Sequence, residues 1–305
     1  MTQTLPPPPR GLDRLRRDAW QRVIAGLDPE RDHETISAVL ARYEFPWDIQ
    51  QALSFALFRT FAVPSIGVLL QETHEFTERT QKRHDDTVLV LDAIIEDGLE
   101  SPNGRAAVRR MNRMHGAYDI SNDDMRYVLS TFVVTPVRWL ADYGYRGLTA
   151  AEIEASTRSY QRIGQLMGIK DIPVDYAAFE ALLDAYEAEH FAYDPRSREV
   201  ADATLELLCT YYPKPLRRAV EVFSRAVMDP HVRDAFGYTA PPPAVVALSR
   251  GLLRLRGRVL RLAPVRVKAS RPEDRGAVRT YLPGGYRIED LGTHVETARS
   301  DATHA

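Results

Sequence analysis

Apolar residues recur at steps of three and four along most of this chain, and polar or proline-containing joints separate the runs. Residues 85–97 show the pattern, with Val88, Leu91 and Ile95 spaced so that they share one face of an α-helix. No segment sustains the two-residue alternation of a half-buried strand, and no repeat period stands out. We therefore expect an all-α protein.

The succession of helical patterns predicts one large domain rather than several. A chain of 305 residues fits a single domain of about ten helices with an irregular C-terminal extension. We expect a disordered Pro-rich leader over residues 1–11 and the helical domain over 12–240. Residues 241–296 are expected to form a basic amphipathic helix and a wrapped extension of the same domain, and 297–305 a disordered tail.

Three local signals refine the helical domain. The apolar run over 57–72 contains Pro64 and Gly67, which predicts two helices or one kinked helix. Pro136 is expected to bend the helix that spans 124–143. The sequence Thr-Ala-Ala-Glu over 149–152 has the form of a capping box and predicts the start of a helix running to about residue 167.

Composition limits the classes of function. Hydrophobic residues make up 44% of the chain and the formal charge is -2, so we expect a globular protein that does not bind nucleic acid. The single cysteine, Cys209, rules out an internal disulfide framework and a Cys-rich metal site. No apolar stretch has the length of a signal core or a membrane span, so we expect a soluble, cytoplasmic protein.

Residues 244–262 leave one alternative open on localisation. This stretch is amphipathic and contains five arginines. It could pack against the body of the protein, which is the commoner role of such a helix, or lie on an anionic membrane surface as a peripheral contact.

The common catalytic motifs do not occur. The sequence contains no GxGxxG after a strand, no GxxxxGK[ST], no GxSxG and no HExxH, and its eight histidines lack the short spacings of a shared metal site. The adjacent carboxylates Asp85-Asp86 and Asp123-Asp124 point in different directions on a helix. Taken alone, they are expected to be helix-start charge and solvated surface.

Several strings in the middle of the chain resemble a known enzyme family. They are KRHDDT (82–87), GRAAVRRMNRMHGAYDISNDDMRYVLSTFVVTPVRWL (104–140), YGYRGLT (143–149), LMGIKDIP (166–173) and LPGGYRIEDLG, which ends at Gly292. In order and spacing they are similar to the family of bacterial latex-clearing rubber oxygenases and the MpaB-type oxygenases of mycophenolic acid synthesis. The similarity is closest to the MpaB-like branch and covers roughly residues 53–292.

The resemblance implies a helical fold that holds a b-type haem through one axial histidine, at His115. The residues themselves are compatible with this role. His115 lies on the apolar face of a predicted helix with Val108 and Met111, and neutral imidazole is the usual ligand of haem iron in an apolar pocket. Without the resemblance, a core histidine satisfied by a backbone carbonyl would be the favoured interpretation.

On the oxygen side of the haem, rubber oxygenases carry an arginine, a lysine and a threonine, and a glutamate base further upstream. Arg83 and Thr87 match the arginine and the threonine, whereas Asp86 replaces the lysine. An aspartate there would hold water, accept a proton or pair with Arg83; the simpler alternative is an ordinary surface ion pair. Glu72 is the candidate base, although its spacing to Arg83 is shorter than the family's, and Glu75 is the alternative.

Other side chains could complete the pocket. Arginine forks suit haem propionates, and the candidates are Arg126, Arg138 and Arg146. Trp139 and Tyr143 could line the pocket, although buried aromatics are core residues by default. His84, one residue from Arg83, is expected to point elsewhere.

The resemblance therefore predicts a haem b-dependent oxygenase that activates dioxygen to cleave or oxidise a hydrophobic small molecule, with isoprenoids as one candidate class. Two alternatives stay open. One is a haem protein with peroxidase-like or dehydrogenase-like activity in secondary metabolism. The other is a non-catalytic helical binding or scaffold protein that kept the fold and lost the cofactor.

Overall fold

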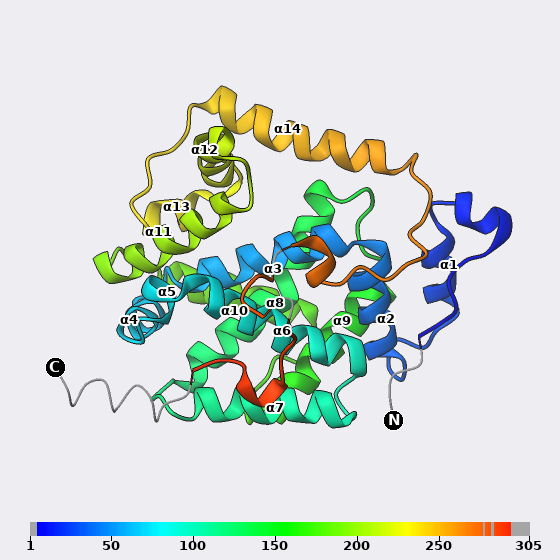
Figure 1. Cartoon of the computed structure of the whole chain (residues 1–305), viewed down its shortest axis with the longest axis horizontal. Coiled ribbons are helices and arrows are strands. Elements are labelled where there is room, and N and C mark those ends of the chain that lie inside the picture. The colour runs from blue at the N-terminus through cyan, green and yellow to red at the C-terminus, as the bar shows by residue number, and fades with distance from the viewer. Residues whose placement is uncertain (1–4, 277, 282–283, 294–305) are drawn as a thin grey trace.

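The computed structural model describes residues 5–276, 278–281 and 284–293, and every regular element within them is helical (Figure 1). The prediction of an all-α protein is confirmed. The described residues form fourteen α-helices rather than about ten, because short helices occupy several joints. The first four residues of the leader and the whole predicted tail lie outside the described residues.

The helices follow one another with short connections. Their bounds are α1 Ala19–Ala25, α2 His33–Val39, α3 Pro46–Thr60, α4 Pro64–Glu72, α5 Glu75–Glu78, α6 Thr80–Asp97, α7 Pro102–His115, α8 Asn122–Tyr143, α9 Ala150–Leu166, α10 Tyr176–His190, α11 Pro195–Thr210, α12 Arg217–Val227, α13 Pro230–Ala235 and α14 Pro243–Leu260. A π-helical segment, Leu40–Glu44, joins α2 to α3. Short 3₁₀ helices lie at Gly11–Leu15, Lys214–Leu216, Glu273–Arg275 and Ile288–Asp290.

Helices α3 and α8 pack against each other at the centre of the molecule (Figure 1). The ring of Phe55 on α3 stacks on Trp139 of α8 with a centroid separation of 5.4 Å. The indole N–H of Trp139 donates to Asp48 at 3.3 Å, and Tyr143 is buried in the same cluster. Trp139 and Tyr143 are therefore core residues. Burying an aromatic side chain contributes about 1.5–3 kcal/mol, so this contact holds the two central helices in register.

The apolar run over residues 57–72 is divided into two helices. Pro64 occupies the first turn of α4, and α3 and α4 are bent by 94° at the break. Gly67 then lets α4 approach α11 closely, since a Cβ there would lie 2.1 Å from Ser197 Oγ. No single helix within the described ranges is long and apolar enough to cross a membrane, whereas α3 and α4 taken together pass that test of length and composition.

The predicted start of α9 is confirmed. The N–H of Glu152 donates to Thr149 Oγ1 at 3.3 Å, and the N–H of Thr149 donates to Glu152 Oε2 at 2.8 Å. This is the reciprocal pair of a capping box. Pro136 lies inside α8, which continues through it to Tyr143.

The chain beyond residue 241 lies along the helical body. Helix α14 lies along the outside of the molecule over α12 (Figure 1). The chain then returns through backbone hydrogen bonds from Val265 to the Arg14 carbonyl at 3.1 Å and from Ser270 to the Arg42 carbonyl at 3.0 Å. Its last described residues pack on α7, which brings the C-terminal segment to the helix that ends at His115.

Candidate active site

A cavity of about 440 Å³ lies between helices α3, α4, α6, α7, α8 and α9. Most of its wall is aliphatic, aromatic or methionine side chain, and the polar groups are few. The lining includes Leu57, Phe61, Ile66, Leu69, Leu70, Val90, Leu91, Met111, Met114, Val128, Leu129, Phe132, Ile163 and Met167, together with His115, Arg83, Thr87 and Asp86. A large apolar cavity with a few convergent polar groups is the usual form of a cofactor or substrate site.

His115 is the last residue of α7 and lines this cavity. Its Nδ1 atom is buried and has no hydrogen-bond partner. Burial, with a smaller contribution from the Arg83 charge, lowers the pKa of His115 to about 4. The imidazole is therefore neutral at physiological pH, which is the form that binds a metal ion. The alternative interpretation, in which a backbone carbonyl accepts a hydrogen bond from His115, does not hold at Nδ1.

The end of α7 is held by the C-terminal segment. Gly292 has φ 80° in the left-handed region, and a Cβ there would lie 1.9 Å from the sulfur of Met114. Arg110 on α7 donates to the carbonyl oxygens of Leu291 and, at 2.9 Å, Thr293. The described end of the LPGGYRIEDLG string thus packs against the helix that carries His115, and the positive φ and close approach at its last residue favour glycine.

Arg83 and Thr87 form one unit on α6. The Arg83 guanidinium donates to Thr87 Oγ1, and the Thr87 hydroxyl donates to the Arg83 carbonyl at 3.0 Å. The guanidinium also lies 5.0 Å from the centroid of the Phe76 ring. Burial lowers the pKa of Arg83, while the charges of Asp86 and Glu75 oppose that shift. Arginine stays protonated in proteins, so α6 places a fixed cation and a hydroxyl in the cavity wall.

Asp86 also faces the cavity, but its partners are not those expected. It accepts hydrogen bonds from Lys82 Nζ at 2.7 Å and from the Tyr281 hydroxyl, and only 2% of it is exposed. It makes no hydrogen bond with Arg83 within the described ranges. Lys82, one helical turn before Asp86, therefore supplies the counter-charge of this carboxylate but does not itself line the cavity.

The expectation that Asp85 and Asp86 are solvated helix-start charge is wrong. Both lie inside α6, and Asp85 is fully buried. Burial opposes ionisation of Asp85, but hydrogen bonds from His84 and from the backbone N–H groups of Thr280 and Arg279 lower its pKa to about 2. The C-terminal segment covers this face of α6, and periodicity within residues 80–97 cannot show a cover that comes from residues 279–281.

Asp124 is likewise buried rather than solvated, in contrast to the expectation from its sequence. It caps the cavity at the start of α8, where it accepts hydrogen bonds from Ser65, Ser121 and Tyr186, each at 2.9 Å. The Ser121 hydroxyl also accepts the N–H of Asp124 at 2.9 Å, as expected for an N-cap. The pattern Ser-x-x-Asp was the available sequence signal for this residue. Its neighbour Asp123 lies in the first turn of α8 and is exposed, as expected.

The structure does not bring Glu72 to the cavity. Glu72 is exposed at the end of α4 and lies 3.4 Å from Arg196. Glu75 is buried, and its charge opposes the lowering of the Arg83 pKa. It nevertheless pairs with Arg79 at 2.6 Å and does not line the cavity. Of the two glutamates, Glu75 lies nearer the Arg83–Thr87 unit.

The three arginines expected at haem propionates have protein carboxylates as partners, and none lines the cavity. The partners are Glu180 and Asp184 for Arg138, Glu44 and Glu152 for Arg146, and Asp123 for Arg126. His84 faces away from the His115 cavity, toward Asp85 at 3.3 Å and Tyr211 at 3.4 Å. The sequence indicated that these guanidinium groups are suited to carboxylates, but it could not indicate which carboxylate lies within reach of each one.

Among the residues that the structure describes, no group of three or more His, Cys, Asp or Glu side chains is placed to hold a metal ion. A haem iron differs from such sites because one axial side chain is enough to attach it. The unpartnered neutral imidazole of His115 in an apolar cavity fits that requirement.

Residues 49–262 match the family model described as "ER-bound oxygenase mpaB/B'/Rubber oxygenase, catalytic domain". The chain belongs to this family. The match spans most of the chain and includes α4 to α13, hence both His115 and the Arg83–Thr87 unit. The family inferred from the short motifs is confirmed.

Curated relatives agree with this assignment. The chain is 31% identical to the ER-bound oxygenase mpaB' of Penicillium brevicompactum over 253 residues, which is 77% of this chain and 60% of the relative. It is 29% identical to the ER-bound oxygenase mpaB of Penicillium roqueforti (strain FM164) over 249 residues, which is 75% of this chain and 84% of the relative. The match to the mpaB of P. brevicompactum, at 30% identity, covers 59% of that relative.

Proposed function

We propose that this member of the oxygenase family holds a b-type haem in the His115 cavity and uses dioxygen to cleave or oxidise a hydrophobic substrate. The observation that carries the proposal is the buried Nδ1 of a neutral histidine, without a partner, in the wall of an apolar cavity of about 440 Å³. An unsatisfied buried polar atom is costly, and a ligand that fills the cavity would remove that cost.

Haem supplies the activation of dioxygen when it is bound, and the protein supplies position, polarity and access. His115 presents a neutral nitrogen because burial and the Arg83 charge disfavour its protonation. The Arg83 guanidinium, positioned by its hydrogen bond to Thr87 Oγ1, would supply positive charge and N–H donors to negative charge that develops on oxygen. The apolar wall excludes water and accommodates a hydrocarbon chain.

Asp86 and the glutamates have narrower roles in this proposal. Lys82 and Tyr281 fix the Asp86 carboxylate at the cavity wall, where it would act as a held hydrogen-bond acceptor. Neither Glu72 nor Glu75 lines the cavity, and we assign the role of a base to neither.

Oxygen uptake tests the proposed function. Protein purified after haem-supplemented expression should consume dioxygen with polyisoprene or farnesyl-type alkenes and release carbonyl or hydroxyl products without added peroxide. A peroxidase-like protein would need peroxide, and a dehydrogenase would leave the carbon skeleton intact. A folded but colourless protein would contradict the oxygenase proposal and favour a non-catalytic binding protein.

We further propose that α14 contacts an anionic membrane peripherally. Large apolar side chains 52–89% exposed follow one another at helical spacing, namely Leu248, Leu252, Leu255, Val259 and Leu262. Residues 243–262 contain no acidic residue, and the arginines at 254 and 258 are exposed among these side chains. The hydrogen bond from Val265 to Arg14 brings the exposed Leu12 and Leu15 to the same end of α14. The relatives' description as ER-bound supports a membrane partner.

Sedimentation with vesicles tests this surface. The protein should bind vesicles that contain phosphatidylserine and dissociate at high salt, because arginine contributes through screened electrostatics. Replacing Leu248, Leu255 and Val259 together with serine should weaken binding by at least ten-fold, on the basis of about 0.8 kcal/mol for each buried CH₂. Val174→Ser is the control, since Val174 is 83% exposed on another part of the surface. Equal binding of the triple variant and the wild type would rule out α14 as the contact.

A further inference from the structure

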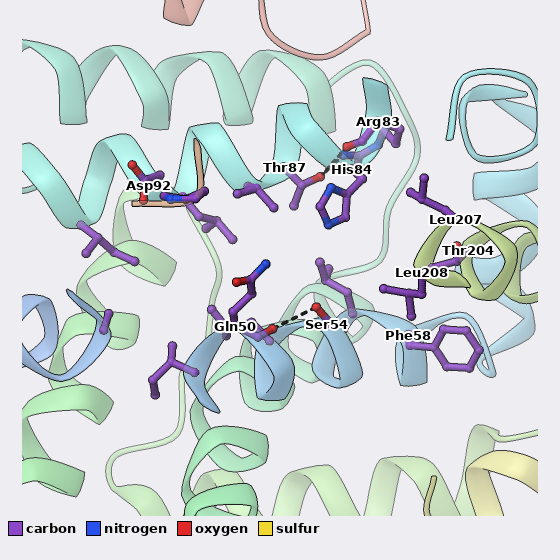
Figure 2. Close-up of a pocket in the computed structure, with 18 of the residues that line it drawn as sticks. Gln50, Ser54, Phe58, Arg83, His84, Thr87, Asp92, Thr204, Leu207 and Leu208 are labelled. Carbon is purple, nitrogen blue, oxygen red and sulfur yellow. Dashed lines mark hydrogen bonds between the residues drawn. The ribbon is translucent and has the colours of Figure 1, made fainter. Parts of the chain in front are cut away.

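A second apolar cavity, of about 140 Å³, lies between α3, α6 and α11 (Figure 2). Figure 2 shows Gln50 and Ser54 of α3 on one side and Thr87 and His84 of α6 on the other, with Leu207 and Leu208 of α11 closing one end. None of these side chains except Thr87 lines the His115 cavity. We call this the α3–α6 cavity.

The α3–α6 cavity and the His115 cavity share a wall. The side chains that line both are Leu57, Phe61, Phe76, Arg83, Thr87 and Leu91. The hydrogen bond from Arg83 to Thr87 lies in this shared wall. A molecule in the α3–α6 cavity is therefore separated from the His115 cavity by a single layer of side chains.

On its other side the α3–α6 cavity adjoins a larger one, of about 840 Å³. The side chains that line both are Gln50, Ser54, Phe58, His84 and Leu208. The wall of the larger cavity includes Leu252, Leu253 and Arg256 of α14. Three adjoining cavities thus run from α14 to His115, with the α3–α6 cavity in the middle.

Two polar side chains in the α3–α6 cavity lack partners within the described part of the chain. Thr204 Oγ1 is buried and makes no hydrogen bond. The side-chain amide of Gln50 makes none either, and Figure 2 shows it projecting into the cavity. Each group can both donate and accept, and in native proteins such groups are normally satisfied. Figure 2 shows Gln50 and Thr204 toward opposite ends of the cavity, so a single hydrogen-bonding group of a ligand could satisfy the Gln50 amide but not both side chains.

Two ionisable groups that line the α3–α6 cavity outside the shared wall already have carboxylate partners, whereas Arg83 lies in the shared wall and donates to Thr87. Arg42 pairs with Asp92 at 2.8 Å and with Glu96 at 3.0 Å. His84 lies 3.3 Å from the Asp85 carboxylate. Charge in an apolar cavity without a counter-charge is strongly disfavoured, so the polar group of the ligand should be neutral.

We propose that the α3–α6 cavity is a substrate site for an apolar chain with one uncharged hydrogen-bonding group, a hydroxyl or a carbonyl, held by Gln50. The apolar chain lies along Leu57 and Leu91 toward the shared wall, which places a carbon of the chain next to the Arg83–Thr87 unit. The inference rests on the proposed function, since it specifies what reaches the haem site and by which face.

Calorimetric titration of the haem-supplemented protein with 1-hexanol and with hexane tests the inference. The wild type should bind the alcohol more tightly than the alkane. Gln50→Leu, which keeps the side-chain size, should weaken alcohol binding about ten-fold, as expected for one hydrogen bond of about 1.4 kcal/mol. Thr204→Val, at the other end of the cavity, should leave alcohol binding unchanged. Alkane binding should change less than two-fold in either variant.

The controls separate this inference from the proposed function. Gln165→Leu, at an exposed position of α9 outside all three cavities, should bind both ligands as the wild type does. His115→Ala should retain alcohol binding even if it loses haem, because His115 does not line the α3–α6 cavity. If Gln50→Leu binds the alcohol as tightly as the wild type while its haem spectrum is intact, the inference fails and the oxygenase proposal stands. If Leu208→Trp, which fills the cavity, leaves both affinities unchanged, the ligand binds elsewhere.

Discussion

Replacing His115 with alanine should abolish the Soret band that we expect of protein expressed with added haem. His115 is the only histidine that lines the cavity among the residues that the structure describes, and its Nδ1 has no protein partner to lose. Removing the axial ligand should weaken haem binding by on the order of 100-fold or more, since even its supporting groups are worth 10–100-fold in metal sites. Absorption spectra of the two proteins at equal concentration, with circular dichroism to verify folding, measure the effect.

His190→Ala serves as the matched control. His190 is also on a helix and half-buried, but its Nδ1 lies 3.1 Å from the Tyr186 carbonyl oxygen and it does not line the cavity. This variant should keep the full Soret band. Added imidazole should restore part of the band in His115→Ala by occupying the vacated position. An unchanged band in His115→Ala would remove His115 as the anchor.

The pH dependence of the same band follows from the pKa of His115, about 4. An ordinary histidine protonates as the pH falls through about 6.5 and ceases to be a ligand. Because the folded-state pKa of His115 is lowered, its imidazole stays neutral below pH 6.5 and becomes protonated only as the pH approaches 4. The Soret band should therefore persist below pH 6.5 and be lost as the pH approaches 4.

Local features of this fold could be predicted from the sequence, because they depend on residues close together in the chain. The capping box at Thr149 and the break at Pro64 are set within one helical turn. The apolar face shared by His115 and Met111 is likewise a property of α7 alone. Spacing alone could not decide between a haem ligand and a core residue at His115. The resemblance to the family gave the reason to prefer the ligand.

The remaining features depend on contacts between distant segments. Asp85 is buried because residues 279–280 donate two backbone N–H groups to it, and no pattern within α6 encodes that cover. Arg138 points to α10 and Arg146 to Glu44 and Glu152, so their forks are occupied before any cofactor could reach them. The α3–α6 cavity is lined by Gln50 of α3 and by Thr204 of α11, which lie 154 positions apart in the sequence, and periodicity along either helix alone cannot show that they share a cavity.

Glu187→Ala should be among the most destabilising single substitutions in this protein. The Glu187 carboxylate accepts hydrogen bonds from the buried Arg59 guanidinium at 2.5 and 2.7 Å, and also contacts His231 at 2.7 Å and Tyr127 at 3.2 Å. Burial opposes ionisation of Glu187, but His231 and Arg59 outweigh it and lower its pKa. Without the carboxylate, the buried Arg59 keeps one counter-charge, Asp229, which lies 3.2 Å away and is half exposed to solvent. We expect a loss of about 3–5 kcal/mol in the free energy of unfolding.

Urea unfolding of the variant and of a surface control would measure this difference. Glu154→Ala breaks the pair between Glu154 and Arg158 on the exposed side of α9, and it should cost less than about 1 kcal/mol. Because the pKa of Glu187 is depressed, its contribution is present above the ordinary glutamate pKa and is lost as the pH falls through its folded value. The free energies of unfolding of the wild type and the variant should therefore converge at low pH. If their difference stays constant as the pH falls, packing rather than charge holds α3 to α10.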